Sequence, residues 1–336
     1  MLVSPIADFP WKARKVGCRF VNLSGEPRPR LRDILSWRLT RNIPPDSFVP
    51  PVAPPDLDAI QSPDPTRITV TWVGHATFLL QLGGRNFLTD PLFGQYCGPV
   101  PARALRRHGP PGLTIDQLPA IDAILVSHCH YDHLDRKSLM SIRSRRHKGR
   151  HGTNVLSVIC PTGVGPLLRR WGMPTVTEMS WGDAGDFDSE GHPIRITCLP
   201  AQHGAARTTF DRDATLWCGW LLQHRGRKVA FLGDSGYGPF FAGLGERFGS
   251  LDLALIPIGA YHPRSLMRTL HMTPEEAVSV HRDLRSSRSI AMHWGTFALA
   301  DDPLAEAPQL LAAARKVASL TEQDFSVLRI GETVLI

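Results

Sequence analysis

The feature that most constrains this fold is a six-residue segment, His128 to His133, in which three histidines and an aspartate directly follow an apolar run. The apolar run at 123–126 is typical of a buried strand. In an extended chain the side chains alternate sides, so His128 and His130 point the same way and can bind one metal ion together. A turn after His130 would direct Asp132 and His133 towards a second ion. The segment therefore predicts a two-metal site at the end of a strand.

Three further candidate ligands lie later in the chain, and each closely follows a strand-like run. They are His203, Asp234 and His293. Imidazole and carboxylate together suit zinc, or manganese, iron and nickel with less preference. The alternative is a solvated polar loop with satisfied histidines, but the H-x-H-x-D-H spacing behind an apolar strand favours the metal site.

The apolar periodicity elsewhere alternates between strand and helix. Residues 273–284 form the clearest helix, because Thr273 suits the N-cap and Pro274 the first helical position. The other predicted helices span 134–145 and 308–318, and the predicted strands span 68–73, 78–82, 86–89, 121–127, 194–199, 216–223, 228–232, 251–258, 289–292 and two segments of 325–336. This pattern predicts an α+β fold of two mixed β-sheets with helices outside, and the site at one edge of the sheets.

Residues 1–65 differ in composition from the rest. They are basic and carry paired prolines such as Pro50-Pro51 and Pro54-Pro55, which favour extended backbone. We expect an N-terminal arm that packs on a catalytic domain at 66–336, with one short helix at 32–40. Contact of the arm with anionic lipid or another subunit is the alternative to this structural role.

Charge and cysteine usage limit the partners and the compartment. The net charge of +7 and pI near 9.3 favour anionic partners, although such charge also serves solubility. The six cysteines include no C-x-x-C pair, which predicts reduced thiols. The first ten residues lack a signal-peptide core, and no run of 18 apolar residues occurs. We therefore expect a cytoplasmic protein, with peripheral contact with the inner membrane left open.

The motifs resemble those of the metallo-β-lactamase superfamily and, within it, the phospholipases D that hydrolyse N-acylphosphatidylethanolamine. The resemblance runs from about residue 66 to the C-terminus. It implies a four-layer αβ/βα sandwich. The stretches that carry it are Thr71–Thr77, Phe87–Pro91, Ser127–Asp135, Gly233–Tyr237, Ile256–Tyr261 and His293–Ala300, with a weaker match around Phe20-Val21-Asn22.

The resemblance also implies how the ligands divide between two zinc ions. His128, His130 and His203 would bind the first ion; Asp132, His133 and His293 would bind the second; Asp234 would bridge them. Two zinc ions about 3.5–4 Å apart hold a bridging hydroxide that attacks phosphorus in line. This chemistry needs no protein nucleophile, and the sequence has neither G-x-S-x-G nor a Cys–His signature.

Two residues are candidates for orienting the metal ligands from outside. Asp90 ends a predicted strand beside the site, where its carboxylate can accept an imidazole N–H, and His75 is a second candidate. Asp90 precedes Pro91, so the alternative is that it caps a turn.

The resemblance also assigns substrate contacts. His271 matches a histidine near the substrate phosphate and would act as an orienter or proton donor, together with the catalytic carboxylates Asp132 and Asp234. The alternative for His271 is a surface histidine leading into a helix. Gln95 and Tyr96 match another pair near the active site.

The expected activity is cleavage of N-acylphosphatidylethanolamine-like lipids to an N-acylethanolamine and phosphatidate. A hydrolase of the same fold acting on a soluble phosphodiester or a lactone is the alternative. Nucleic acid is not an expected partner, because no basic stripe with interleaved aromatics occurs. The resemblance leaves a homodimer open.

Overall fold

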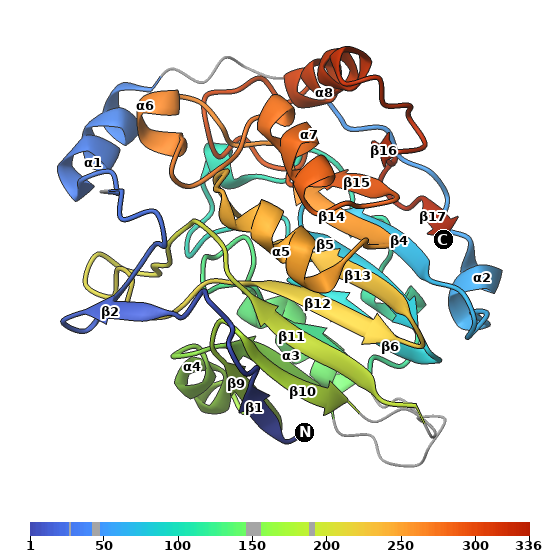
Figure 1. Cartoon of the computed structure of the whole chain (residues 1–336). Helices are drawn as coiled ribbons and strands as arrows, with labels where there is room; N and C mark the ends of the chain where they lie inside the picture. Colours follow the sequence, from blue (N-terminus) through green and yellow to red (C-terminus); the bar gives the residue numbers. More distant parts are fainter. Residues whose placement is uncertain (27, 42–47, 146–155, 188–191) are drawn as a thin grey trace.

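Two mixed β-sheets pack face to face and helices cover their outer sides, as the computed structural model shows (Figure 1). It describes residues 1–26, 28–41, 48–145, 156–187 and 192–336. The predicted α+β sandwich of two mixed sheets flanked by helices is confirmed.

The larger sheet has eight strands in the order β1-β10-β11-β12-β13-β14-β15-β16. The strands β10 to β13 pair antiparallel, and β13 to β16 pair parallel. Their bounds are Val3–Pro5 (β1), Asp183–Phe187 (β10), Ile194–Leu199 (β11), Gly219–His224 (β12), Arg227–Phe231 (β13), Leu253–Pro257 (β14), Ser289–Met292 (β15) and Phe325–Ser326 (β16).

The smaller sheet has seven strands in the order β17-β4-β5-β6-β7-β8-β9. Strands β17 to β6 pair antiparallel and β6 to β9 pair parallel. Their bounds are Thr69–Gly74 (β4), Thr77–Leu82 (β5), Arg85–Thr89 (β6), Ala123–Leu125 (β7), Ser157–Pro161 (β8), Thr175–Met179 (β9) and Thr333–Leu335 (β17). The two closing strands predicted at the C-terminus therefore belong to different sheets.

The helices pack on the outer faces of the sheets. Helix α7 contacts α5, α8 and strand β14, whereas α4 lies on β9 and α2 on β4. Thr273 caps α7 in a capping box with Glu276, and Pro274 follows as predicted. The helices are Leu31–Thr40 (α1), Leu57–Gln61 (α2), Arg136–Ser144 (α3), Gly165–Arg170 (α4), Phe240–Phe248 (α5), Arg264–Met267 (α6), Pro274–Asp283 (α7) and Glu306–Val317 (α8). No helix in the described part of the chain is long and apolar enough to cross a membrane.

The N-terminal segment enters the fold at two places. Strand β1 extends the eight-stranded sheet by pairing with β10. Arg14–Val16 (β2) and Arg19–Val21 (β3) form a separate hairpin. Phe9 and Phe20 are buried in the main hydrophobic core. The segment therefore contributes backbone pairing as well as side chains to the main body.

Candidate metal centre

The seven predicted ligands converge where strands of both sheets end. The 128–133 segment follows β7 in the smaller sheet. His203 follows β11, Asp234 follows β13 and His293 follows β15, all in the larger sheet. Parallel strands bring their carboxyl ends to one edge, which explains how residues far apart in sequence meet here.

Three imidazoles form one half of the centre, which we call the three-histidine half. Nε2 of His128 and Nε2 of His203 lie 2.8 Å and 3.3 Å from Nδ1 of His130. His203 Nδ1 donates to the Leu270 carbonyl at 2.8 Å, and His128 Nδ1 lies 2.9 Å from Ser127 Oγ. Ser127 Oγ donates its proton to Asp90, so it accepts from His128 Nδ1; with both Nδ1 atoms protonated, the Nε2 lone pairs of His128 and His203 face His130.

Two imidazoles and a carboxylate form the other half, which we call the carboxylate half. Asp132 Oδ2 lies 3.3 Å from His133 Nε2 and 3.6 Å from His293 Nε2. His75 belongs to the same cluster and places Nε2 3.1 Å from Asp132 Oδ2.

Asp234 lies between the two halves. Its Oδ2 is 3.1 Å from His133 Nε2 and 3.2 Å from His293 Nε2 in the carboxylate half. The same oxygen is 3.9 Å from His128 Nε2 and 3.7 Å from His203 Nε2 in the three-histidine half. One carboxylate can therefore serve both halves.

A buried carboxylate contacts a predicted ligand from outside the centre. Asp90 Oδ2 accepts the Nδ1–H of His133 at 2.7 Å, which directs His133 Nε2 into the centre. Ser127 donates its backbone N–H to Asp90 Oδ1 at 2.7 Å and its hydroxyl to Asp90 Oδ2 at 2.5 Å. Ser127 Oγ also contacts His128, so Asp90 and Ser127 link a ligand of each half.

Backbone strain concentrates at the centre. His75, Asp90 and His293 have positive φ values of 53°, 32° and 60°, which cost side-chain-bearing residues of order 1–3 kcal/mol each. Gly233 has a φ of 61°, and a Cβ there would lie 2.7 Å from Ser127 Cβ. The surrounding packing thus holds conformations that the local sequence alone would not favour.

Burial makes the imidazoles of the three-histidine half hard to protonate. It lowers the pKa of His128 and His203 well below the usual histidine range, and neighbouring imidazoles add to the shift. It also lowers the pKa of His130 to about 4. These rings are neutral at pH 7 and can offer lone pairs to a cation.

His133 and His293 in the carboxylate half behave in the opposite way, whereas burial lowers the pKa of the neighbouring His75 to about 3. Burial disfavours charge there too, but Asp234 and Asp132 outweigh it and raise the pKa of His133 well above its usual range. Burial is likewise outweighed by Asp234 and Asp132 at His293, whose pKa rises to about 9. Burial alone would raise the pKa values of Asp132 and Asp234, but the nearby His133 holds both well below the usual aspartate range.

The donor atoms suit metal binding. His133 Nε2, His293 Nε2 and Asp234 Oδ1 are buried and have no hydrogen-bond partner among the described residues. Buried polar atoms without partners are rare and call for an ion or water. Three imidazoles on one side, two imidazoles and a carboxylate on the other, and a shared carboxylate match zinc preferences.

The proposed substrate residues lie in two different settings. The ring of His271 is 5.0 Å from the His203 ring and 5.3 Å from the His293 ring, so the structure brings it to the centre. Gln95 is exposed, and Tyr96 forms a β-bridge with Arg106. In the described part of the chain, no hydrogen bond, ion pair or ring contact joins Gln95 or Tyr96 to the seven predicted ligands.

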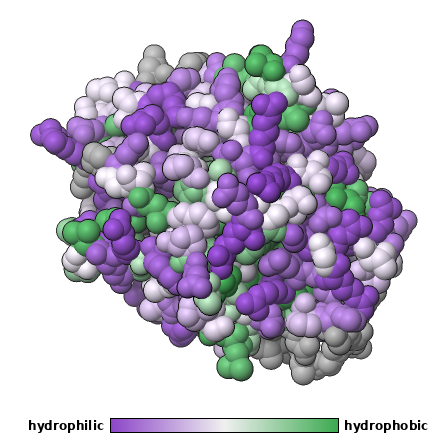
Figure 2. Space-filling view, viewed as in Figure 1, coloured by the Kyte–Doolittle hydropathy of each residue, from purple (hydrophilic) through white to green (hydrophobic). Residues whose placement is uncertain are grey.

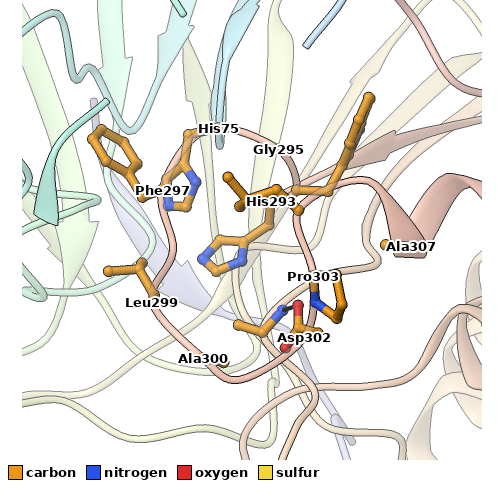
Figure 3. Close-up of a pocket in the computed structure, with 12 residues that line it drawn as sticks. His75, His293, Gly295, Phe297, Leu299, Ala300, Asp302, Pro303 and Ala307 are labelled. Carbon is orange, nitrogen blue, oxygen red and sulfur yellow. Dashed lines mark hydrogen bonds between the residues drawn. The ribbon is translucent and has the colours of Figure 1, made fainter. Parts of the chain in front are cut away.

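A small pocket adjoins the carboxylate half, and most of the residues that line it are apolar. His75 and His293 lie at one side, with Phe297, Leu299 and Ala300 along the same loop (Figure 3). Phe297 packs edge-on against His75 with ring centroids 5.2 Å apart. The pocket places apolar side chains next to a charged centre.

Two residues in contact with ligands were not singled out from the sequence. Ser127 directly precedes the histidine segment at the strand end, and that position was the available signal. Asn22 hydrogen-bonds the backbone of His203 from 181 positions away. No spacing rule connects residues so far apart, and only the weak match at Phe20-Val21-Asn22 pointed to it.

Comparison with known proteins gives consistent results. The family described as "Beta-lactamase superfamily domain" matches residues 85–294. An N-acyl-phosphatidylethanolamine-hydrolyzing phospholipase D of Caenorhabditis elegans is 36% identical over 83% of this chain and 79% of its own length. An uncharacterized protein of Mycobacterium tuberculosis is 36% identical over 88% of this chain and 76% of its own length. A possible metal-dependent hydrolase of Veillonella parvula has the same fold, with a TM-score of 0.63, 18% identity, and coverage of 80% of this chain and 100% of that one.

Proposed function

The chain belongs to the metallo-β-lactamase superfamily and is a metal-dependent hydrolase, and on that premise we propose a zinc-dependent phosphodiesterase of phospholipase D type. Its substrates would be N-acylphosphatidylethanolamine-like lipids, cleaved to an N-acylethanolamine and phosphatidate. The observation that carries this proposal is the position of Asp234 between a three-histidine half and a carboxylate half. The similarity to the worm phospholipase directs the choice of substrate.

The residues divide the chemical work. His128, His130 and His203 would hold one zinc ion, and Asp132, His133 and His293 the other, with Asp234 between them. The bound ions would lower the pKa of water towards about 7 and neutralise charge on the phosphoryl oxygens. Asp90 and His75 hold His133 and Asp132 in place through contacts of 2.7 Å and 3.1 Å.

His271 acts on the substrate as a neutral ring. Burial lowers its pKa to about 3, so it carries no extra proton at pH 7. Its Nδ1 is buried and has no hydrogen-bond partner among the described residues. We assign it a hydrogen bond to a phosphoryl oxygen, which orients the phosphate without protonating it.

The surface near the pocket suits an amphiphilic substrate. Arg41, just after α1, donates to the carbonyls of Ala298, Leu299 and Ala300 in the pocket loop. Helix α1 also exposes 44% of Leu35 and 87% of Leu39 to solvent. Polar residues cover most of the face drawn in Figure 2, with small separate apolar patches. Two exposed leucines on a helix that is tied to the pocket loop support a lipid substrate.

The test is product analysis by mass spectrometry. Zinc-loaded protein would be incubated with vesicles containing N-acylphosphatidylethanolamine, in parallel with a soluble phosphodiester and a lactone. We expect N-acylethanolamine and phosphatidate in equal amounts from the vesicles, and none with His130→Ala. Turnover of only the soluble phosphodiester or the lactone would replace the lipid assignment with that of a same-fold hydrolase for soluble substrates.

A further inference from the structure

We propose that Asn22, from the N-terminal arm, is a positioning residue that fixes the backbone of His203 for metal binding. The proposal depends on the zinc assignment but not on the lipid substrate. It makes the first residues of the chain part of the metal centre, and not only a segment wrapped around the catalytic domain.

The Asn22 side chain pairs with both backbone groups of His203. Its Nδ2 donates to the His203 carbonyl at 2.9 Å, and its Oδ1 accepts the His203 N–H at 3.0 Å. A carboxamide used in this way replaces the peptide group of a neighbouring strand. Two hydrogen bonds in parallel fix position and rotation together, which a single bond does not.

Trp217 sets the orientation of this carboxamide. Its Nε1–H lies 3.1 Å from Asn22 Oδ1 and also reaches the Ala201 carbonyl at 2.9 Å. An indole nitrogen can only donate, so the oxygen of the amide must face Trp217. The amide nitrogen is then left to face the His203 carbonyl.

Both hydrogen bonds are shielded from water. Asn22 is 4% exposed and His203 is 1% exposed. No other backbone partner of His203 is described, so loss of Asn22 would leave a buried donor and a buried acceptor without partners. Such groups are costly, and the chain would shift to satisfy them.

The arm is anchored to the same loop at a second point. The Phe20 N–H donates to the Asp213 carbonyl at 2.8 Å, and the Asp213 N–H donates to the Ala205 carbonyl at 2.6 Å. These hydrogen bonds hold strand β3 beside the loop that contains His203, and they fix the position of Asn22, which directly follows β3. Beyond β11 no strand holds residue 203, so the arm supplies the support that a neighbouring strand would give.

His203 needs this support because one hydrogen bond, at Nδ1, ties its ring to a described group outside the metal centre. Its Nδ1 donates to the Leu270 carbonyl, which orients the ring plane. The distance of the His203 ring from His128 and His130 is set by the position of the His203 backbone. This distance matters because the Nε2 atom of His203 must point at the ion that His128 and His130 bind. Small displacements of a ligand weaken a metal site, and outer contacts of this kind are worth about 10–100-fold in metal affinity.

The experiment is a chelator competition on full-length protein, with zinc counted per folded chain. We expect Asn22→Ala to weaken zinc binding about 10–100-fold. In a His203→Ala background the same substitution should cause no further loss, because its effect passes through His203. Circular dichroism and the Tm would confirm that each variant is folded.

Asn86→Ala is the matched control. The Asn86 carboxamide also ties segments together, with Nδ2 donating to the Ala120 carbonyl at 2.7 Å and Oδ1 accepting from Gln81 at 2.9 Å. None of these groups is a ligand, so its zinc affinity should equal that of the wild type. If Asn22→Ala does not fold, Asn22→Asp keeps the acceptor for His203 N–H but puts a carboxylate oxygen in place of the donor, opposite the His203 carbonyl, and a weaker zinc affinity is expected there too.

Folded Asn22→Ala or Asn22→Asp protein with wild-type zinc affinity would overturn the inference alone. Equal losses from Asn22→Ala with and without His203 would also overturn it, since they would indicate a general structural role. A wild-type chain that binds no zinc would overturn the proposed function, and this inference with it.

Discussion

The two halves of the metal centre share one carboxylate but differ in their affinity for protons. The rings of His128, His130 and His203 are buried among other imidazoles, which lowers their pKa values. His133 and His293 lie beside two carboxylates, which raises theirs. Under the proposed ligand assignment, histidine would serve one half as a ready ligand and the other as a group that must lose a proton before it binds metal.

The largest effect is expected from removing the shared carboxylate. Asp234→Ala takes away the only predicted ligand common to both halves, so both zinc affinities should fall. Activity should drop by about 1,000-fold or more, the scale seen when one member of a catalytic unit is removed. Steady-state kinetics and zinc counts per chain would measure this. A variant that loses only one ion would show that Asp234 is not shared.

The next largest effect is a difference between the two halves in how their zinc affinity depends on pH. Zinc binding to the carboxylate half should strengthen as pH rises from 6 to 9, by about tenfold per unit for each proton released. Zinc binding to the three-histidine half should stay level, because burial lowers the pKa of His130 to about 4 and the pKa values of His128 and His203 well below the usual histidine range. Chelator competition across this range would show two zinc classes. Parallel pH curves for both ions would contradict the difference between the halves.

The metal-free chain should show the matching stability profile. The raised pKa values of His133 and His293 add to the free energy of unfolding. This contribution is fully present at pH values below about 6.5, the pKa of histidine in the unfolded chain. This contribution is lost as pH rises through about 9 for His293. The Tm of chelator-treated protein should therefore fall between pH 7 and 10, and zinc-loaded protein should not show this loss.

A smaller difference in zinc affinity between the halves is expected when the hydrogen bond from His133 to Asp90 is weakened. Asp90→Asn keeps the size of the side chain but weakens its hold on the His133 Nδ1–H. The carboxylate half should lose about 10–100-fold in zinc affinity, and the three-histidine half much less. Zinc titration of the variant would measure both. Equal losses of zinc affinity in both halves would instead indicate that Asp90 supports the whole 128–133 segment.

The smallest effect is expected at Ser127, which contacts a residue of each half. Ser127→Ala removes a buried hydroxyl that bonds to Asp90 and His128. The cost should be about 1 kcal/mol, or roughly fivefold in affinity, divided between the two ions. A loss confined to one ion would show which half depends on this bridge.

Sequence patterns predicted the parts of the fold that depend on local periodicity. The strands that lead to His128, His203, Asp234 and His293 were predicted because each is an apolar run followed by a polar ligand. The strands β8, β9 and β10 were not, since their region lacks clear alternation and recognisable motifs. Local composition likewise gave no sign that β1 would join the larger sheet, because edge pairing depends on the partner strand.

The site was predictable as a set of residues but not as an arrangement. Spacing alone suggested that His128 and His130 share an ion, and the resemblance supplied the rest of the ligand set. The link between Asn22 and His203 depends on tertiary packing over 181 positions. The opposite pKa directions of the two halves depend on burial and on which carboxylates lie nearby, and neither follows from residue order.

The ligands come from both sheets: the 128–133 segment from the smaller one, and His203, Asp234 and His293 from the larger one. Zinc bound there would cross-link the two sheets. Its binding free energy would add to the free energy of unfolding of the folded chain. The lifetime of the folded protein in a cell would then follow the local zinc supply, so scarcity would reduce the amount of enzyme as well as its turnover.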